Sequence, residues 1–294
     1  EGRNIGQDFV LKDGWRMYHG SKVPGFPAHP HRGFETITVA TKGLIDHSDS
    51  MNASGRYGNG DTQWMSAGKG VQHGEMFPLL NSQSDNELEL FQIWINLPSH
   101  SKMCEPHFKM FWNENSTVVQ EKDEQDNDIK IKVITGRYKQ SEGEAPPPHS
   151  WANDKNNHVA IWLVELSAHA KWQMPNAGSR TNSMLYFYEG DDITISNNQI
   201  RSGHGIKLDP VGDTLVENGN KASKFLIMQG DPINEPVAQY GPFVMNTQQE
   251  IQQAFEDYRA TQFGGWPWDE AEVVHGHSKR FAKHSDGKID RPET

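Results

Sequence analysis

Residues 29–36 read HPHRGFET, and the first three of them form an H-x-H pair, His29-Pro30-His31. Residues i and i+2 of an extended chain point to the same side, so the two imidazoles can converge on one point. Pro30 stiffens this segment and keeps His29 out of the α region. A lone H-x-H pair is more often ordinary packing, so its meaning depends on the neighbouring sequence.

A second segment, GDTQWMSAGKGVQHGEM at residues 60–76, contains His73-Gly74-Glu75. This triplet has the same spacing, with a carboxylate in place of the second imidazole. Three imidazoles and one carboxylate suit Fe, Mn, Co, Ni, Cu or Zn. Four protein ligands leave open positions on a five- or six-coordinate ion, and chemistry takes place at such positions. The two segments together therefore indicate a mononuclear metal site.

Around these segments the chain has the pattern of a β protein. Several short runs are rich in β-branched and aromatic residues. These are Thr36–Ala40, Glu89–Asn96, Ile129–Thr135, Val159–Leu166, Met184–Tyr188 and Phe225–Met228. Turn residues separate the runs, and many short strands at close spacing indicate a sandwich or small barrel. The charged residues 121–128 and the prolines at 146–148 lie between two such regions, so we predict domains at 1–136 and 137–294.

The C-terminal part has a helical pattern instead. We predict one helix over about 246–263, where Thr247 caps the N-terminus and Glu250 completes a capping box. Apolar residues recur on one face, and Gly264-Gly265 ends the helix. A coil follows, in which His275-Gly276-His277 forms another H-x-H. We interpret that pair as exposed polar coil, because a mobile tail does not preorganise ligands.

The charge and the cysteine count limit the partners and the compartment. The chain has 28 basic and 39 acidic residues, a net charge of -11. Such a chain repels phosphate backbones, so we expect no direct binding of nucleic acid. No run of about 18 apolar residues is present, and we expect no membrane span. The single cysteine, Cys104, fits a reducing compartment, and we expect a cytoplasmic protein.

The two histidine segments resemble the two motifs of the cupins. More specifically, PHRGFET at 30–36, GDTQWMSAGKGVQHGEM at 60–76 and NEPVAQYGPFVMNTQQEIQQAFEDY at 234–258 are similar to segments of one cupin family, the pirins. This resemblance covers nearly the whole chain. It implies an all-β fold of two tandem cupin, jelly-roll-like barrels with a C-terminal helix and coil. It also implies a monomer.

The resemblance to pirins also implies the metal ligands. Pirins bind one metal, usually iron, through positions that correspond here to His29, His31, His73 and Glu75. We therefore expect Fe(II), with Mn, Co, Ni, Cu or Zn as alternatives. Glu35 lies four residues after His31, so in a continuing strand it would share the face of His31 and hold an imidazole N–H. We expect the second barrel to be metal-free and to cover and shape the first.

The resemblance leaves two functions open. The first is a quercetin 2,3-dioxygenase-type enzyme, which opens a flavonol with O2, with Glu75 as the catalytic proton acceptor. Aromatic and apolar side chains would bind the flat substrate, and the candidates are Phe34, Trp64, Met65 and Phe91. The second function is a non-enzymatic regulator whose metal oxidation state alters a surface that binds a partner protein. The same four ligands serve both functions.

Overall fold

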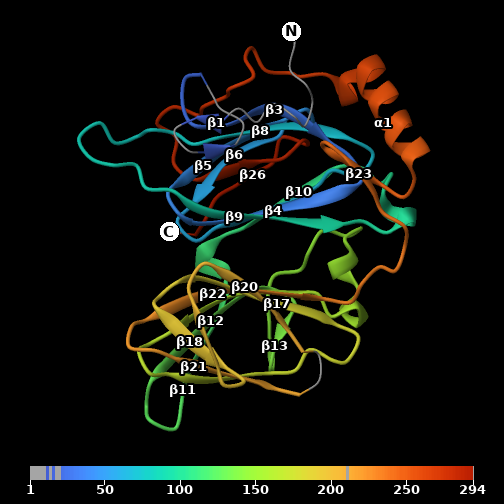
Figure 1. Ribbon diagram of the computed structural model, residues 1–294. Helices are drawn as coiled ribbons and strands as arrows, with labels where there is room; N and C mark the ends of the chain where they lie inside the picture. Colours follow the sequence, from blue (N-terminus) through green and yellow to red (C-terminus); the bar gives the residue numbers. More distant parts are fainter. Residues whose placement is uncertain (1–10, 13–14, 17–20, 210–211, 294) are drawn as a thin grey trace. The chain divides into compact units, whose positions relative to one another are not determined.

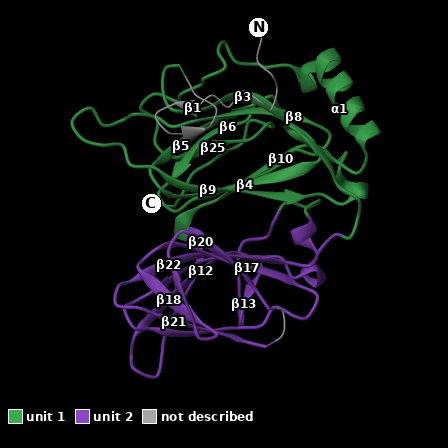
Figure 2. Ribbon diagram, in the orientation of Figure 1, with its two compact units in different colours: residues 1–114, 147–150, 234–294 green, residues 115–146, 151–233 purple. Residues whose placement is uncertain are grey.

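The structure is a computed structural model that describes residues 11–12, 15–16, 21–209 and 212–293. The chain divides into two compact units (Figure 2). Unit 1 contains the described residues of 1–114, 147–150 and 234–294, and unit 2 contains those of 115–146 and 151–233. This grouping differs from the predicted division at residue 136, because residues 115–136 belong to unit 2 and residues 234–294 belong to unit 1.

Unit 1 is built on two antiparallel sheets (Figure 1). The four-stranded sheet has the order β10 (His107–Phe111), β7 (Thr62–Ser66), β4 (Phe34–Lys42) and β9 (Glu89–Asn96). The six-stranded sheet has the order β26 (Ile289–Asp290), β25 (Phe281–Lys283), β6 (Ser54–Gly58), β5 (Leu44–Asp49), β8 (Val71–Met76) and β3 (Gly25–His31). Every residue of β6, β7 and β8 is buried, on both faces of its strand. Polar side chains on these strands are therefore enclosed within the protein.

The C-terminal helix belongs to unit 1. Helix α1 (Gln248–Thr261) has the predicted capping box, in which Thr247 accepts from the backbone N–H of Glu250 and the Glu250 side chain accepts from that of Thr247. Ile251 and Ala254 are buried against the hairpin of β23 (Ala238–Tyr240) and β24 (Phe243–Met245). The helix ends before the predicted residue 263, because Gln262 adopts a left-handed conformation.

The tail after α1 joins the six-stranded sheet. Strand β25 pairs with β6, and β26 pairs with β25. In the segment that precedes β25, the carbonyls of Gly276 and Ser278 accept hydrogen bonds from the buried Arg56. Arg56 also forms an ion pair with Asp46. His275 is half-buried, with its ring Nε2 2.8 Å from the carbonyl oxygen of His47. The interpretation of residues 275–277 as mobile exposed coil is therefore wrong for His275.

Unit 2 also consists of two antiparallel sheets. The larger has the order β11 (Thr117–Lys122), β12 (Asp128–Thr135), β15 (Ala160–Leu166), β22 (Ser223–Gly230), β17 (Asn182–Glu189) and β20 (His204–Leu208). The smaller has the order β16 (Lys171–Met174), β21 (Thr214–Asn218), β18 (Asp192–Ile195) and β19 (Asn198–Arg201). The core of unit 2 is apolar and contains the buried Trp162, Trp172, Phe187 and Phe225. All six strands predicted from the sequence are present, in β4, β9, β12, β15, β17 and β22.

Short elements complete the description. Two small hairpins are formed by β1 (Leu11–Lys12) with β2 (Trp15–Arg16) and by β13 (Arg137–Tyr138) with β14 (Ser141–Glu142). The 3-10 turns are η1 (Ser99–Ser101), η2 (Asn113–Asn115), η3 (Trp151–Asn153), η4 (Lys155–Asn157) and η5 (Gln262–Gly264). In the part of the chain that is described, no helix has the length and apolar character that crossing a bilayer requires.

Candidate metal centre

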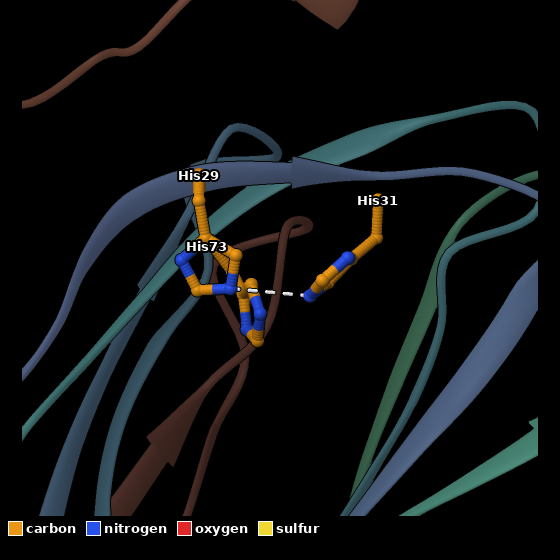
Figure 3. A group of neighbouring side chains, drawn as sticks. All are labelled: His29, His31 and His73. Carbon is orange, nitrogen blue, oxygen red and sulfur yellow. Dashed lines mark hydrogen bonds between the residues drawn. The ribbon is translucent and has the colours of Figure 1, made fainter. Parts of the chain in front are cut away.

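Three histidines from two neighbouring strands meet inside unit 1. His29 and His31 lie on β3, and His73 lies on the adjacent strand β8, directly opposite His29 in the register. One ring nitrogen from each residue lies within 4.8 Å of the other two. The three side chains point toward one another in Figure 3. The H-x-H spacing and the antiparallel pairing therefore bring together the three predicted imidazole ligands.

Backbone carbonyls orient the first two rings. The Nδ1 atom of His29 lies 2.8 Å from the carbonyl oxygen of Pro27, and that of His31 lies 3.4 Å from the carbonyl oxygen of Pro242. With Nδ1–H as the donor, each ring keeps a lone pair on Nε2. The two Nε2 atoms are 3.1 Å apart, as the dashed line in Figure 3 marks. A shared cation removes the repulsion between two such lone pairs.

The distances and the polar groups fit a metal ion. With metal–nitrogen bonds of about 2.1 Å, two ligands at a right angle lie about 3.0 Å apart, close to the separation of the two Nε2 atoms. His73 is fully buried, and neither of its ring nitrogens has a hydrogen-bond partner among the described residues. A buried polar group without a partner is costly, and coordination would satisfy it. The three imidazoles can therefore hold a metal ion.

Burial keeps these imidazoles in the form that binds metals. It lowers the pKa of His29 and lowers the pKa of His31 and His73 well below the usual value, because a charged ring is poorly solvated there. The neighbouring imidazoles lower the pKa of His73 further. Neutral rings have the lone pairs that metal binding requires. The site is therefore arranged to receive a cation without first losing protons.

Glu75 lies on the same strand as His73, two residues further on and therefore on the same face. Its carboxylate is not part of the three-histidine group. One oxygen accepts hydrogen bonds from Thr38 and Tyr57, and the other accepts one from Gln92. The sequence motif pointed to none of these three donors, because they come from β4, β6 and β9.

Glu35 does not contact the histidines, contrary to the prediction for a continuing strand. Strand β3 ends at His31 and β4 begins at Phe34, and between them Gly33 has a φ of 83°. This break places Phe34 beside the His31 ring, at 5.0 Å between centroids. Glu35 therefore lies on the opposite face of β4, where it accepts hydrogen bonds from Ser66 and Ser150.

One aromatic side chain beside the site was not among the predicted wall residues. Trp94 lies 5.6 Å from His31 and 4.3 Å from Phe34 between ring centroids, and it is 42% exposed. Phe34, one of the predicted wall residues, lies beside His31. Trp64 and Phe91 pair with Ile37 and Val39, which lie on the face of β4 that carries Glu35. The sequence signal that could have identified Trp94 was the period of two along β9, which places Gln92 and Trp94 on the same face of the strand.

Arg32 connects the segment that carries His31 to the C-terminal helix. Its side chain donates to the carbonyl of Lys69, forms a 2.7 Å ion pair with Asp257 of α1, and lies over the ring of Phe263. The backbone of Arg32 also bonds to residues 242 and 244. Residues after position 240 therefore fix the position of His31.

The two-sheet β structure and the histidine triad define a protein of the cupin class with side chains that could hold a metal ion. Residues 2–95 match the family profile described as Pirin, and residues 161–264 match that of the Pirin C-terminal cupin domain. A pirin-like protein of Caulobacter vibrioides is 35% identical over 239 residues, which cover 81% of this chain and 80% of the relative. Pirin-1 of Arabidopsis thaliana is 37% identical over 246 residues, covering 82% and 78%. The chain belongs to the pirin family.

A solved structure agrees with this assignment. The crystal structure of a quercetin 2,3-dioxygenase from Acinetobacter baumannii superposes with a TM-score of 0.72 and 31% sequence identity. The superposition covers 84% of this chain and 81% of that one. The prediction of two cupin domains with a C-terminal helix is thereby confirmed.

Proposed function

We propose that unit 1 contains the active site of a metal-dependent dioxygenase that opens a flavonol such as quercetin with O2. The observation that carries the proposal is the histidine triad beside a partly exposed aromatic ring, Trp94. The likeness to the Acinetobacter baumannii protein named quercetin 2,3-dioxygenase supports this choice of substrate class. A flavonol fits both features, because its enolic hydroxyl can lie beside the metal and its flat ring system can lie against Trp94.

The ligands in this proposal are His29, His31, His73 and Glu75, and the proposed ion is Fe(II). Imidazole and carboxylate donors together are typical of non-haem iron oxygenases. When bound, the ion supplies Lewis acidity and an open position for substrate and O2. Mn, Co, Ni, Cu and Zn remain chemically compatible alternatives that reconstitution distinguishes.

The protein's own side chains bind and deprotonate the substrate. Trp94 packs on the buried Phe34, with the two rings inclined at 35°, and its exposed part offers an aromatic surface next to His31. Such a surface binds a planar ring system with well-defined orientation. Glu75 accepts the proton of the 3-hydroxyl group, because its carboxylate lies on the same face of β8 as His73 and a carboxylate can act as a general base. The resulting electron-rich enolate is the species that reacts with O2.

Incubation of the reconstituted protein with quercetin in air tests this function. Metal-free protein is loaded separately with Fe(II), Mn, Co, Ni or Cu, and the loss of flavonol absorbance is followed together with release of carbon monoxide. We expect catalytic turnover with at least one metal and none with the His73→Ala variant. If every loaded form is inactive, the dioxygenase proposal is wrong. Co-purification of one stoichiometric protein from native lysate would then favour the regulatory alternative.

A further inference from the structure

Three donors from three strands surround the carboxylate of Glu75. Thr38 on β4 donates to Oε1 at 2.9 Å, and Tyr57 on β6 donates to the same oxygen at 3.2 Å. Gln92 on β9 donates to Oε2 at 2.5 Å. Gln92 also donates to Thr38 Oγ1 at 3.3 Å, which leaves the hydroxyl hydrogen of Thr38 for Glu75. Glu75 is 1% exposed, so these contacts replace water.

The hydrogen bonds leave little of the carboxylate available. An ionised carboxylate has about four lone-pair positions, two on each oxygen. Thr38 and Tyr57 use both positions on Oε1, and Gln92 uses one on Oε2. One lone pair on Oε2 therefore remains.

We propose that Thr38, Tyr57 and Gln92 are positioning residues that hold Glu75 as a ligand through one oxygen only, Oε2. The proposal rests on the proposed metal site, and it does not require that quercetin be the substrate. Because the metal would take the last free lone pair of the carboxylate, Glu75 can accept a substrate proton only after its hydrogen bond from Gln92 or its bond to the metal is released. Three hydrogen bonds fix the plane of the carboxylate, so the remaining lone pair has a fixed direction. Partners that orient a ligand in this way commonly contribute 10- to 100-fold to metal affinity.

The test measures binding of Co(II) alone to metal-free protein, by competition with a chelator and by the visible absorption of the bound ion. The variants are Thr38→Val, Tyr57→Phe and Gln92→Met, each close in shape to the native side chain. We expect each to raise the Kd for Co(II) roughly 10- to 100-fold and to change the absorption spectrum. Thr38→Ser keeps a hydroxyl and should retain the native Kd and spectrum.

Two matched variants control for the loss of a buried hydroxyl. Thr62→Val alters a buried threonine of β7 that pairs with Val39, on the face of β4 opposite Thr38. Tyr138→Phe alters a buried tyrosine of unit 2, whose hydroxyl contacts Glu121 and Trp172. Both should bind Co(II) as the native protein does. Circular dichroism and the midpoint of thermal unfolding show whether each variant is folded.

A double-mutant cycle separates positioning from general loosening of the barrel. In a Glu75→Gln background, Thr38→Val and Gln92→Met should add less than twofold to the Kd for Co(II), because their effect passes through Glu75. Full additivity in that background would overturn the proposal. So would folded Thr38 and Gln92 variants with the native Kd and spectrum, or a native protein that binds no Co(II). Absence of quercetin turnover would overturn only the proposed function.

Discussion

Glu35 gives the sharpest test of the electrostatics of unit 1. This carboxyl group has no exposed surface, and burial raises its pKa from 4.5 to about 7, against the opposing effect of hydrogen bonds from Ser150 and Ser66. The folded protein therefore holds a proton here that the unfolded chain releases above pH 4.5. Stability from this group is complete below pH 4.5 and is lost as the pH rises through about 7.

The size of the effect follows from the shift in pKa. One pKa unit corresponds to about 1.4 kcal/mol, so the ionised form of Glu35 costs unit 1 about 3 kcal/mol above pH 7. Glu35→Gln removes the charge and keeps a side chain that can bond to both serine hydroxyls. We expect the variant to match the native protein near pH 4.5 and to be more stable at pH 8, by up to about 3 kcal/mol.

Urea unfolding at pH 4.5, 6, 7 and 8 measures this difference. Hydrogen exchange on peptides of unit 1 assigns the transition, because the chain has two compact units and need not unfold in one step. Glu105→Gln is the control, since Glu105 is an exposed carboxylate of the same unit. Parallel curves for native and Glu35→Gln protein across this range would show that Glu35 is not held protonated, and the reasoning from burial would fail.

Three further predictions concern the site and the helix. Glu75→Gln should reduce turnover of quercetin by more than it reduces metal content, because it removes the proposed proton acceptor; full activity with full metal would exclude that role. Trp94→Ala should raise the KM for quercetin about three- to tenfold through the lost aromatic contact, with kcat and metal content unchanged, whereas an unaltered KM would remove Trp94 from the substrate site. Thr247→Ala should destabilise unit 1 by about 1 kcal/mol through loss of the helix cap, and an unchanged urea midpoint would contradict the observed capping box.

The histidine triad could be predicted from the sequence because its geometry is local. The period of two along an extended chain places His29 and His31 on one face, and Pro30 favours that extended conformation. The structure brings these two residues together with His73 as expected. The strand runs and the capping box of α1 were predictable for the same reason, since each depends on neighbours within a few residues.

Features that depend on pairing between distant strands were not predictable in this way. The predicted position of Glu35 was wrong because the chain bends between β3 and β4, where Gly33 has a positive φ. This bend changes which residues face the histidines. The donors to Glu75 come from strands whose mutual register no local pattern specifies. The sequence did show that Trp94 and Gln92 share one face of β9. That this face lies beside the histidines could be recognised only from the pairing of β9 with β4.

The return of residues 234–294 to unit 1 has a consequence for synthesis on the ribosome. The strand that carries His29 and His31 emerges early, yet the carbonyl of Pro242 and the carboxylate of Asp257 that hold this segment are made some two hundred residues later. The carbonyls of Gly276 and Ser278, which accept hydrogen bonds from the buried Arg56, are likewise made much later than Arg56. Chains fold from the N-terminus as they emerge, but unit 1 can be completed only after the segment from residue 234 onward has been made. Unit 2, whose residues lie within 115–233, can fold first.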